Sequence, residues 1–277
     1  MKRAINIRPA RLSAFMLALL PFLLAAGFYV SASLARHAEN PADRLLPSAS
    51  QLADGIRRVA IEEDKRTGEI ILWSDTAASL ERLAWGVGIS TAAGLVFGMA
   101  IGMFPLVRST FAPSIAVLSL IPPMAVLPII FVMFGLGEVA KIVLIVLGTA
   151  PVIIRDLHGR VQDLPREQLI KAQSLGASSW QIALRVVLPQ VLPRLLDALR
   201  LSLGAAWLFL ISAEAIAAED GLGYRIFLLR RYLAMDVILP YVAWITLLAW
   251  LMDRGLRALH RRAFPWLHAN TATGDAP

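Results

Sequence analysis

Long runs of uncharged, apolar residues divide this chain, and they constrain its fold more than any other feature. The stretch between Arg11 and Arg36 contains no charged side chain. About 20 apolar residues suffice to carry a helix across the hydrocarbon core of a bilayer. Further runs of predominantly apolar residues follow at 83–107, 109–137, 138–154, 201–218 and 237–252. Because a helix satisfies its own backbone hydrogen bonds, the sequence predicts an all-α, polytopic membrane protein with about six transmembrane helices.

The composition supports this class. Of the 277 residues 57% are hydrophobic and 17% are charged, whereas soluble domains carry about 25% charged residues. The absence of cysteine excludes disulfides and thiolate metal sites. The formal net charge of +7 is typical of a membrane protein whose lysines and arginines set its orientation. We therefore expect membrane lipid, and no nucleic acid, as a partner.

The distribution of lysine and arginine predicts that both termini are cytoplasmic, because most of these residues then lie on the inner side. The basic residues before the first run raise a cleaved signal peptide as an alternative. That run is longer than the apolar region of a typical signal peptide, and more spans follow it, which favours an uncleaved first helix. The expected organisation is a cytoplasmic N-terminus at 1–11, a first transmembrane helix at 12–35, a periplasmic segment at 36–82, a membrane core at 83–258 with a cytoplasmic loop at 155–200, and a cytoplasmic tail at 259–277.

Local patterns within these segments predict further detail. Ser48 or Ser50 is placed to cap a short surface helix in the periplasmic segment. Gly94, Gly98 and Gly102 form a face of small residues that allows a neighbouring helix to approach closely.

The run at 109–137 contains three prolines, Pro122, Pro123 and Pro128. Proline removes a backbone donor and disrupts the helix interior. Inside a bundle such a break is tolerated where neighbours or water satisfy the freed backbone groups. The sequence predicts either a kinked helix that lines a cavity or a merely irregular helix.

The polar loop at 155–200 predicts two short helices joined by a glycine. Pro165 suits the first turn of one helix, and Gly176 is placed to end it. Ser178 or Ser179 can cap the second helix. Pro189 and Pro193 are then expected to interrupt this helix before the next span.

This arrangement is an elbow, and apolar residues such as Leu175 and Trp180 form a ridge along it. An exposed apolar ridge usually has a partner. The alternative is that the ridge packs back onto the helical bundle, and the periodicity does not separate the two.

The segment "LIKAQSLGASSWQIALRVVLPQVLP", residues 169–193, resembles the EAA loop of ABC importer permeases. Ala172 matches the second alanine of that motif, and Gly176 matches its glycine. The closing I-x-L-P is matched by Val186, Leu188 and Pro189. The segment departs from the motif where Ile170 replaces the glutamate and Lys171 the first alanine.

The segments at 121–154, 198–226 and 261–268 are similar to the nitrate, sulfonate and taurine branch of these permeases. The resemblance as a whole covers residues 46–266. It implies a type I ABC importer permease-like fold in the bacterial inner membrane. It also implies a homodimer with cytosolic ATPase subunits and a periplasmic solute-binding protein. The elbow would be the coupling helix, and the expected ATPase contacts are Ala172, Leu175, Gly176, Ala177, Ser178, Trp180, Leu188 and Pro189.

The expected translocation pathway includes Pro122, Pro123, Ser212 and Glu214. A carboxylate within a membrane span is costly and is by default a functional candidate. Glu214 either lines the pathway or gate, or pairs with an arginine, or lies at the water interface near Glu219 and Asp220.

The sequence lacks the motifs of a self-powered transporter or of an enzyme. No G-x-x-x-x-G-K-[ST] occurs, so the chain has no Walker loop for ATP. The four histidines have no metal-ligand spacing, and no second acid is placed to work with Glu214 in an intramembrane enzyme. We therefore expect no catalytic residue, metal or cofactor on this chain.

Two alternatives to the leading function stay open. One is a permease for urea- or guanidine-like solutes, since residues 166–201 are also similar to permeases of that group. The other is a secondary transporter or channel without an ATPase partner.

Overall fold

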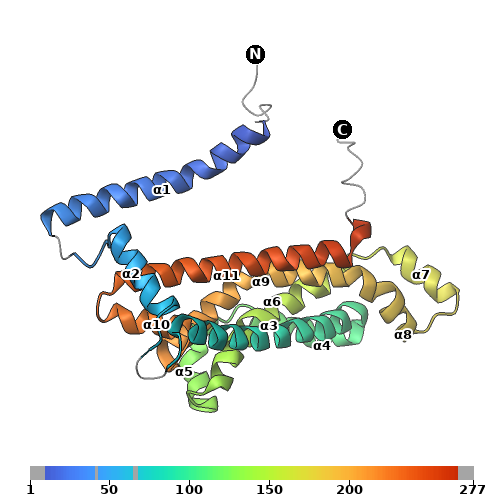
Figure 1. The fold of residues 1–277 in the computed structure, drawn as a ribbon. Helices are drawn as coiled ribbons and strands as arrows, with labels where there is room; N and C mark the ends of the chain where they lie inside the picture. Colours follow the sequence, from blue (N-terminus) through green and yellow to red (C-terminus); the bar gives the residue numbers. More distant parts are fainter. Residues whose placement is uncertain (1–9, 41–42, 65–67, 268–277) are drawn as a thin grey trace.

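The computed structural model describes residues 10–40, 43–64 and 68–267. Within these ranges every regular element is a helix, as the sequence predicts (Figure 1). The basic N-terminal segment 1–9 and residues 268–277 of the predicted tail lie outside the described residues. The elements are α1 Arg11–Glu39, α2 Ala49–Ala60, α3 Ile71–Met103, α4 Pro105–Leu118, α5 Pro123–Phe134, α6 Glu138–Gln162, α7 Arg166–Ser174, α8 Ser179–Ile182, a π-helical turn Ala183–Val187, α9 Leu188–Ala217, α10 Leu222–Arg230, α11 Met235–Ala263 and a 3-10 turn Pro265–Leu267.

Four helices in the described part of the chain are long and apolar enough to cross a membrane. They are α1, α3, the helix that runs unbroken from Ser179 to Ala217, and α11. The bent pair of α4 and α5 makes a fifth when it is counted as one span. The remaining long helix, α6, has 25 residues and packs along α3 and α9. The predicted number of about six is reached when the bent pair and α6 are both counted.

Several helices extend well beyond the predicted apolar runs. The predicted second span begins at residue 83, but α3 begins at Ile71, inside the segment predicted to be periplasmic. At the other end of the chain α11 continues to Ala263, beyond the predicted end at residue 252. The missed part of α3 contains Asp75 and Arg82, which are buried and ion-paired. Hydropathy alone ends a span at such charges because it cannot recognise their partners.

The run at 109–137 is broken more sharply than a kinked helix would be. α4 and α5 meet at 98°, with the break at residues 119–122. Pro122 precedes the first residue of α5 and Pro123 occupies its first turn, where a missing N–H costs nothing. Pro122 and Pro123 therefore start a new helix rather than bend an existing one, whereas Pro128 lies inside α5.

The glycine face of α3 packs directly against α6, as the sequence predicts. A Cβ atom placed on Gly94 would lie 2.3 Å from the Ile153 side chain, and one on Gly102 would lie 2.4 Å from Val161. Only glycine permits so close an approach of the two helices. This contact fixes α3 and α6 as the central pair of the bundle.

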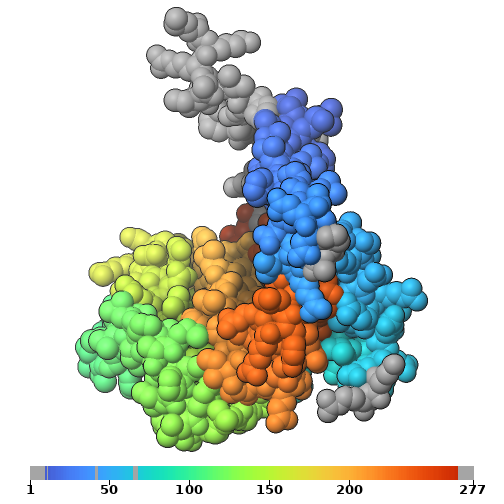
Figure 2. All heavy atoms as spheres, turned by 90° about the vertical axis from the view of Figure 1, so that its left-hand side faces the viewer, coloured from blue at the N-terminus to red at the C-terminus, as the bar shows by residue number. Residues whose placement is uncertain are grey.

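The N-terminal elements lie at one side of the bundle. α1 lies apart from the other spanning helices (Figures 1 and 2), and none of its most apolar stretch is buried. α2 is the predicted surface helix, and Ser48 is its cap. The Ser48 hydroxyl accepts a hydrogen bond from the Gln51 amide at 3.3 Å, and the Gln51 side chain accepts one from the Ser48 amide at 2.8 Å.

Candidate functional site

The elbow, residues 165–189, lies at one end of the bundle, where α7 and α8 project beyond the long helices (Figure 1). α7 ends at Ser174, and Gly176 follows with φ of +81°. The Gly176 amide donates to the Gln173 carbonyl at 2.9 Å, and the Ala177 amide donates to the Ala172 carbonyl at 3.1 Å. These two bonds form a Schellman motif, which requires a left-handed residue that glycine adopts without strain.

The second arm of the elbow starts immediately after this turn. Ser178 is the N-cap of α8, and its hydroxyl accepts a hydrogen bond from the Gln181 amide at 3.3 Å. The Gln181 side-chain oxygen in turn accepts from the Ser178 amide at 2.8 Å. This reciprocal capping box identifies Ser178, of the two candidate serines, as the cap.

The predicted interruption at Pro189 and Pro193 is wrong. The helix continues from Ser179 to Ala217 over 39 residues. A π-helical turn at Ala183–Val187 precedes Pro189, and the Leu188 amide donates to the Ala183 carbonyl five residues earlier. Pro189 directly follows this wide turn and Pro193 lies inside α9, and neither proline ends the helix. The elbow is therefore continuous with a transmembrane helix.

The predicted apolar ridge divides into two faces. Leu175 is 83% exposed and Trp180 is 72% exposed. Ala172 and Ala177, in contrast, are half-buried against a cluster that contains Ile182. Of the other predicted contact residues Gly176, Ser178 and Pro189 are exposed and Leu188 is half-buried. The inner face packs back onto the bundle and anchors the elbow. That the exposed outer face has a partner stays a prediction.

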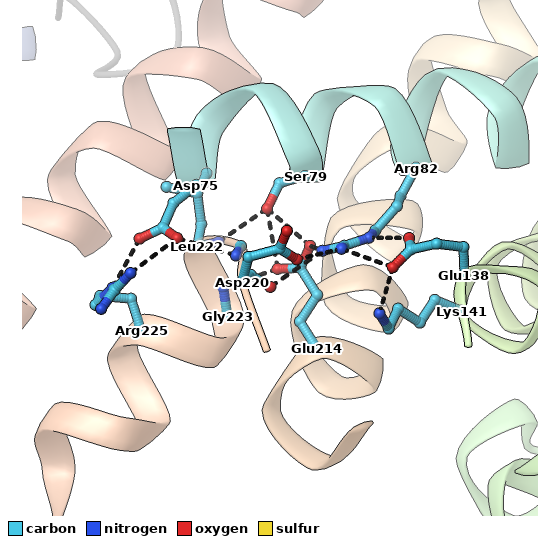
Figure 3. A network of polar contacts seen from close by, with 11 residues as sticks. Asp75, Ser79, Arg82, Glu138, Lys141, Glu214, Asp220, Leu222, Gly223 and Arg225 are labelled. Atoms are coloured by element: carbon cyan, nitrogen blue, oxygen red, sulfur yellow. Dashed lines mark hydrogen bonds and ion pairs between the residues drawn. The ribbon is translucent and has the colours of Figure 1, made fainter. Parts of the chain in front are cut away.

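A polar network (Figure 3) lies where α10 meets the start of α3, at the end of the bundle opposite the elbow (Figure 1). At its centre Arg82 of α3 is 4% exposed and Glu214 of α9 is fully buried. Arg82 Nη1 donates to Glu214 Oε1 at 2.8 Å. Arg82 also pairs with Glu138 and Asp220, which are both more than half exposed. The residues of this polar network are Asp75, Ser79, Arg82, Glu138, Lys141, Glu214, Asp220, Gly223 and Arg225.

Glu214 receives two further hydrogen bonds. The Ser79 hydroxyl donates to Glu214 Oε1 at 2.8 Å, and the Gly223 amide donates to Oε2 at 2.8 Å. Gly221 crosses the pair with φ of +107°, and a Cβ there would lie 2.6 Å from the Glu214 carboxyl carbon and 2.7 Å from Arg82 Nη1. The chain between α9 and α10 is thus pressed against the ion pair, which keeps water away from it.

Asp75 forms a second centre in the same network. It is 1% exposed and accepts hydrogen bonds from Arg225 Nε at 2.8 Å, from the Tyr241 hydroxyl at 3.0 Å and from the Gly221 amide at 3.0 Å. Burial opposes the charge on Arg225, but the hydrogen bond and charge of Asp75 outweigh it and raise the pKa of the guanidinium. The Arg82–Glu214 pair therefore ties α3 to α9, and the Asp75–Arg225 pair ties α3 to α10.

These contacts bear on the predicted pathway residues. Of the alternatives for Glu214, the structure shows pairing with an arginine, and in the single chain Glu214 exposes no surface. The Ser212 hydroxyl donates to the Leu208 carbonyl at 2.7 Å within α9. Pro122 is exposed and Pro123 is half-buried at the start of α5, far along the chain from Ser212 and Glu214. A pathway role for these four residues stays a prediction.

Sequence reasoning missed Asp75, Ser79 and Arg82, which it placed in a periplasmic segment. Their spacing of four and then three residues puts them on one helix face. That periodicity was the available signal, and it leads back to a helix that starts before the apolar run. No group of three His, Asp or Glu side chains that could hold a metal ion occurs in residues 10–40, 43–64 and 68–267.

Comparison with known proteins relates this geometry to transport. Residues 91–265 match the family described as "Binding-protein-dependent transport system inner membrane component". The chain is 42% identical over 196 residues to the taurine transport system permease protein TauC of Escherichia coli (strain K12), which covers 70% of this chain and 71% of that protein. It is 36% identical over 160 residues to the putative aliphatic sulfonates transport permease protein SsuC of the same organism, with 57% and 59% covered.

Two more distant relatives extend the comparison. The chain is 32% identical over 161 residues to the nitrate import permease protein NrtB of Leptolyngbya laminosa, with 58% of this chain and 57% of that protein covered. The solved inward-facing structure of the MetNI methionine ABC transporter matches 66% of this chain and 95% of its own, with a TM-score of 0.52 at 24% identity. The latter similarity concerns the fold alone.

Proposed function

The chain belongs to the family of binding-protein-dependent transport system inner membrane components, and from this premise we propose how it works and what it carries. It is a membrane-spanning permease component of an ABC importer and not an enzyme. We propose that two copies form the translocation pathway, that separate cytosolic ATPase subunits drive it, and that a periplasmic binding protein delivers the solute. Both termini would then be cytoplasmic.

The exposed outer face of the elbow carries this proposal. Leu175 and Trp180 present apolar surface at 83% and 72% exposure on an arm that is otherwise anchored. Such a projecting surface needs a partner in water. A cytosolic ATPase subunit would fit it, as the resemblance to the EAA loop implies, although Ile170 and Lys171 depart from that motif.

The continuous helix from Ser179 to Ala217 supplies a route for the motion. At 1.5 Å per residue its 39 residues span about 58 Å. Its first turn is part of the elbow, and Glu214 near its last turn is bonded to Arg82 of α3. We propose that displacement of the elbow by the ATPase moves this helix as a unit and shifts its contacts in the polar network. The bundle would then open to alternate sides of the membrane.

We propose a small sulfonate of the taurine type as the solute. The support is the 42% identity to a taurine permease, together with the sulfonate and nitrate permeases among the relatives. Urea- or guanidine-like solutes remain the alternative. In both cases the binding protein would make most of the selection.

Reconstitution tests the mechanism. The chain is placed in liposomes with its ATPase subunit, its binding protein outside and ATP inside, and uptake of labelled taurine is measured. The proposal expects uptake that requires both the ATPase subunit and ATP hydrolysis. Uptake that persists when the ATPase subunit is omitted would show a secondary transporter or channel instead.

A separate measurement tests the solute. Taurine, a longer alkanesulfonate, nitrate, urea and guanidinium are each added to the purified binding protein, and its thermal unfolding is followed. The proposal expects the largest rise in unfolding temperature with taurine or the alkanesulfonate, because a ligand stabilises the state that binds it. A rise with urea or guanidinium alone refutes the sulfonate assignment and leaves the coupling mechanism untouched.

A further inference from the structure

A groove of about 700 Å³ lies between α9 and the last turns of α11, at the same end of the bundle as the elbow. It is not part of the elbow or of the polar network. Its lining is dominated by basic side chains from two helices, Arg194, Arg200, Arg254, Arg257, Arg261 and His260.

The arginines of the groove outnumber its carboxylates. Arg200 pairs with Asp253 at 3.0 Å and with Asp197 at 3.4 Å, and Arg257 also pairs with Asp253. These two aspartates are therefore already engaged. They hold Arg200 and Arg257 in place and tie α9 to α11, so the groove has a defined shape.

Three arginines of the groove keep their charge unmatched. No described carboxylate lies within ion-pair distance of Arg194, Arg254 or Arg261, and all three are exposed. Arg254 is positioned over the Trp250 ring, with 5.4 Å from its guanidinium carbon to the ring centroid. Three cations that converge on one concave surface make a site for an anion with several oxygen acceptors, such as a phosphate group.

Apolar residues on both sides place the groove at the edge of the membrane. One turn before Arg254, Trp250 and Leu251 are about half exposed on α11. On the other side Trp266 is 60% exposed in the 3-10 turn that follows the helix. Tryptophan is enriched at the level of lipid headgroups, and arginines at that level pair with lipid phosphates.

We propose that this groove binds the phosphate of an anionic phospholipid in the cytoplasmic leaflet. The headgroup would lie among Arg194, Arg254 and Arg261, and the acyl chains would follow the apolar surface beside Trp250. The leaflet rests on the proposed function, in which the elbow faces the cytoplasm. The lipid would hold α9 against α11 near the point where the elbow joins the bundle.

Native mass spectrometry of the purified full-length permease tests the site. Retention of phosphatidylglycerol is compared with that of phosphatidylcholine for the natural chain and for the double variant R254Q/R261Q. At about 1 kcal/mol for each arginine, the double variant should bind phosphatidylglycerol about thirtyfold more weakly, and R261Q alone about fivefold. Phosphatidylcholine retention should not change.

A matched control and a soluble competitor make the outcomes distinct. R230Q/R231Q removes the same charge from two exposed arginines at the other end of the bundle and should retain phosphatidylglycerol fully. Equal loss in both double variants, or equal retention of the two lipids by the natural chain, would overturn the proposal. Full displacement of the lipid by millimolar inorganic phosphate would also overturn it, because the site would then serve a soluble anion.

The readout requires neither ATP nor solute, so it does not depend on the proposed transport cycle. If uptake fails while phosphatidylglycerol is retained, the transport proposal fails and the lipid site stands. Thermal unfolding of each variant identifies a chain that has lost its fold, and R261Q then provides the milder test.

Discussion

Replacing Arg82 by methionine is expected to destabilise the bundle strongly. Arg82 is 4% exposed, and its partner Glu214 is fully buried. Without the guanidinium, Glu214 keeps only the Ser79 hydroxyl and the Gly223 amide as donors. Removing one partner of a buried ion pair costs about 3–5 kcal/mol, because the remaining charge is uncompensated. We expect R82M to lower the free energy of unfolding by about that amount.

Removing the other partner of the pair, Glu214, should lower the free energy of unfolding by less. In E214L Arg82 retains Glu138 and Asp220, both of which reach solvent. The double variant R82M/E214L removes both buried charges and replaces them by apolar side chains of similar size. Because such replacements are often neutral, it should recover most of the loss seen in R82M.

Equilibrium unfolding of the four chains in mixed micelles, followed by circular dichroism, gives the coupling free energy from a double-mutant cycle. R58M is the matched control, since Arg58 and Asp236 form a pair at 2.5 Å that is partly exposed. Its loss should be below about 1 kcal/mol. If R82M costs no more than R58M, or if the double variant is no more stable than R82M, the ion pair is not what holds α3 to α9.

Four further substitutions test separate parts of the reasoning. W180E places a charge on the proposed ATPase contact, so ATP-dependent taurine uptake in liposomes should be lost. Because Trp180 is exposed, thermal stability should stay within about 0.5 kcal/mol. Unchanged uptake would exclude Trp180 from coupling. G176V forces a β-branched residue to φ of +81°, which should distort the elbow and thereby weaken uptake. G159A is the control, because a Cβ there meets no neighbour. S178A removes the cap of α8 and should cost about 1 kcal/mol, seen as faster amide exchange of Gln181. G94L overlaps Ile153 and should cost more than about 1 kcal/mol in chemical unfolding, whereas G88L meets no neighbour and should not.

The elbow shows which local features a sequence can predict. The Gly176 turn and the Ser178 cap depend on contacts within six residues, and both are readable from residue type and spacing. The failure at Pro189 has the opposite cause. A proline can end a helix by its local geometry, but here the helix continues through the π turn at Ala183–Val187, where Ile182 and Val187 are buried in the core.

The sequence by itself therefore determined the helical class, the approximate number of spans, and the glycine turn and serine cap of the elbow, because each depends on hydropathy or on hydrogen bonds between near neighbours. Only the tertiary structure decided the polar network and the basic groove. Arg82 and Glu214 are 132 residues apart in the chain, and Arg200 and Asp253 are 53 apart. A charge within an apolar run has no visible partner in the sequence. Whether it ends a helix, lines a pathway or is buried in an ion pair depends on which distant residue the fold brings to it.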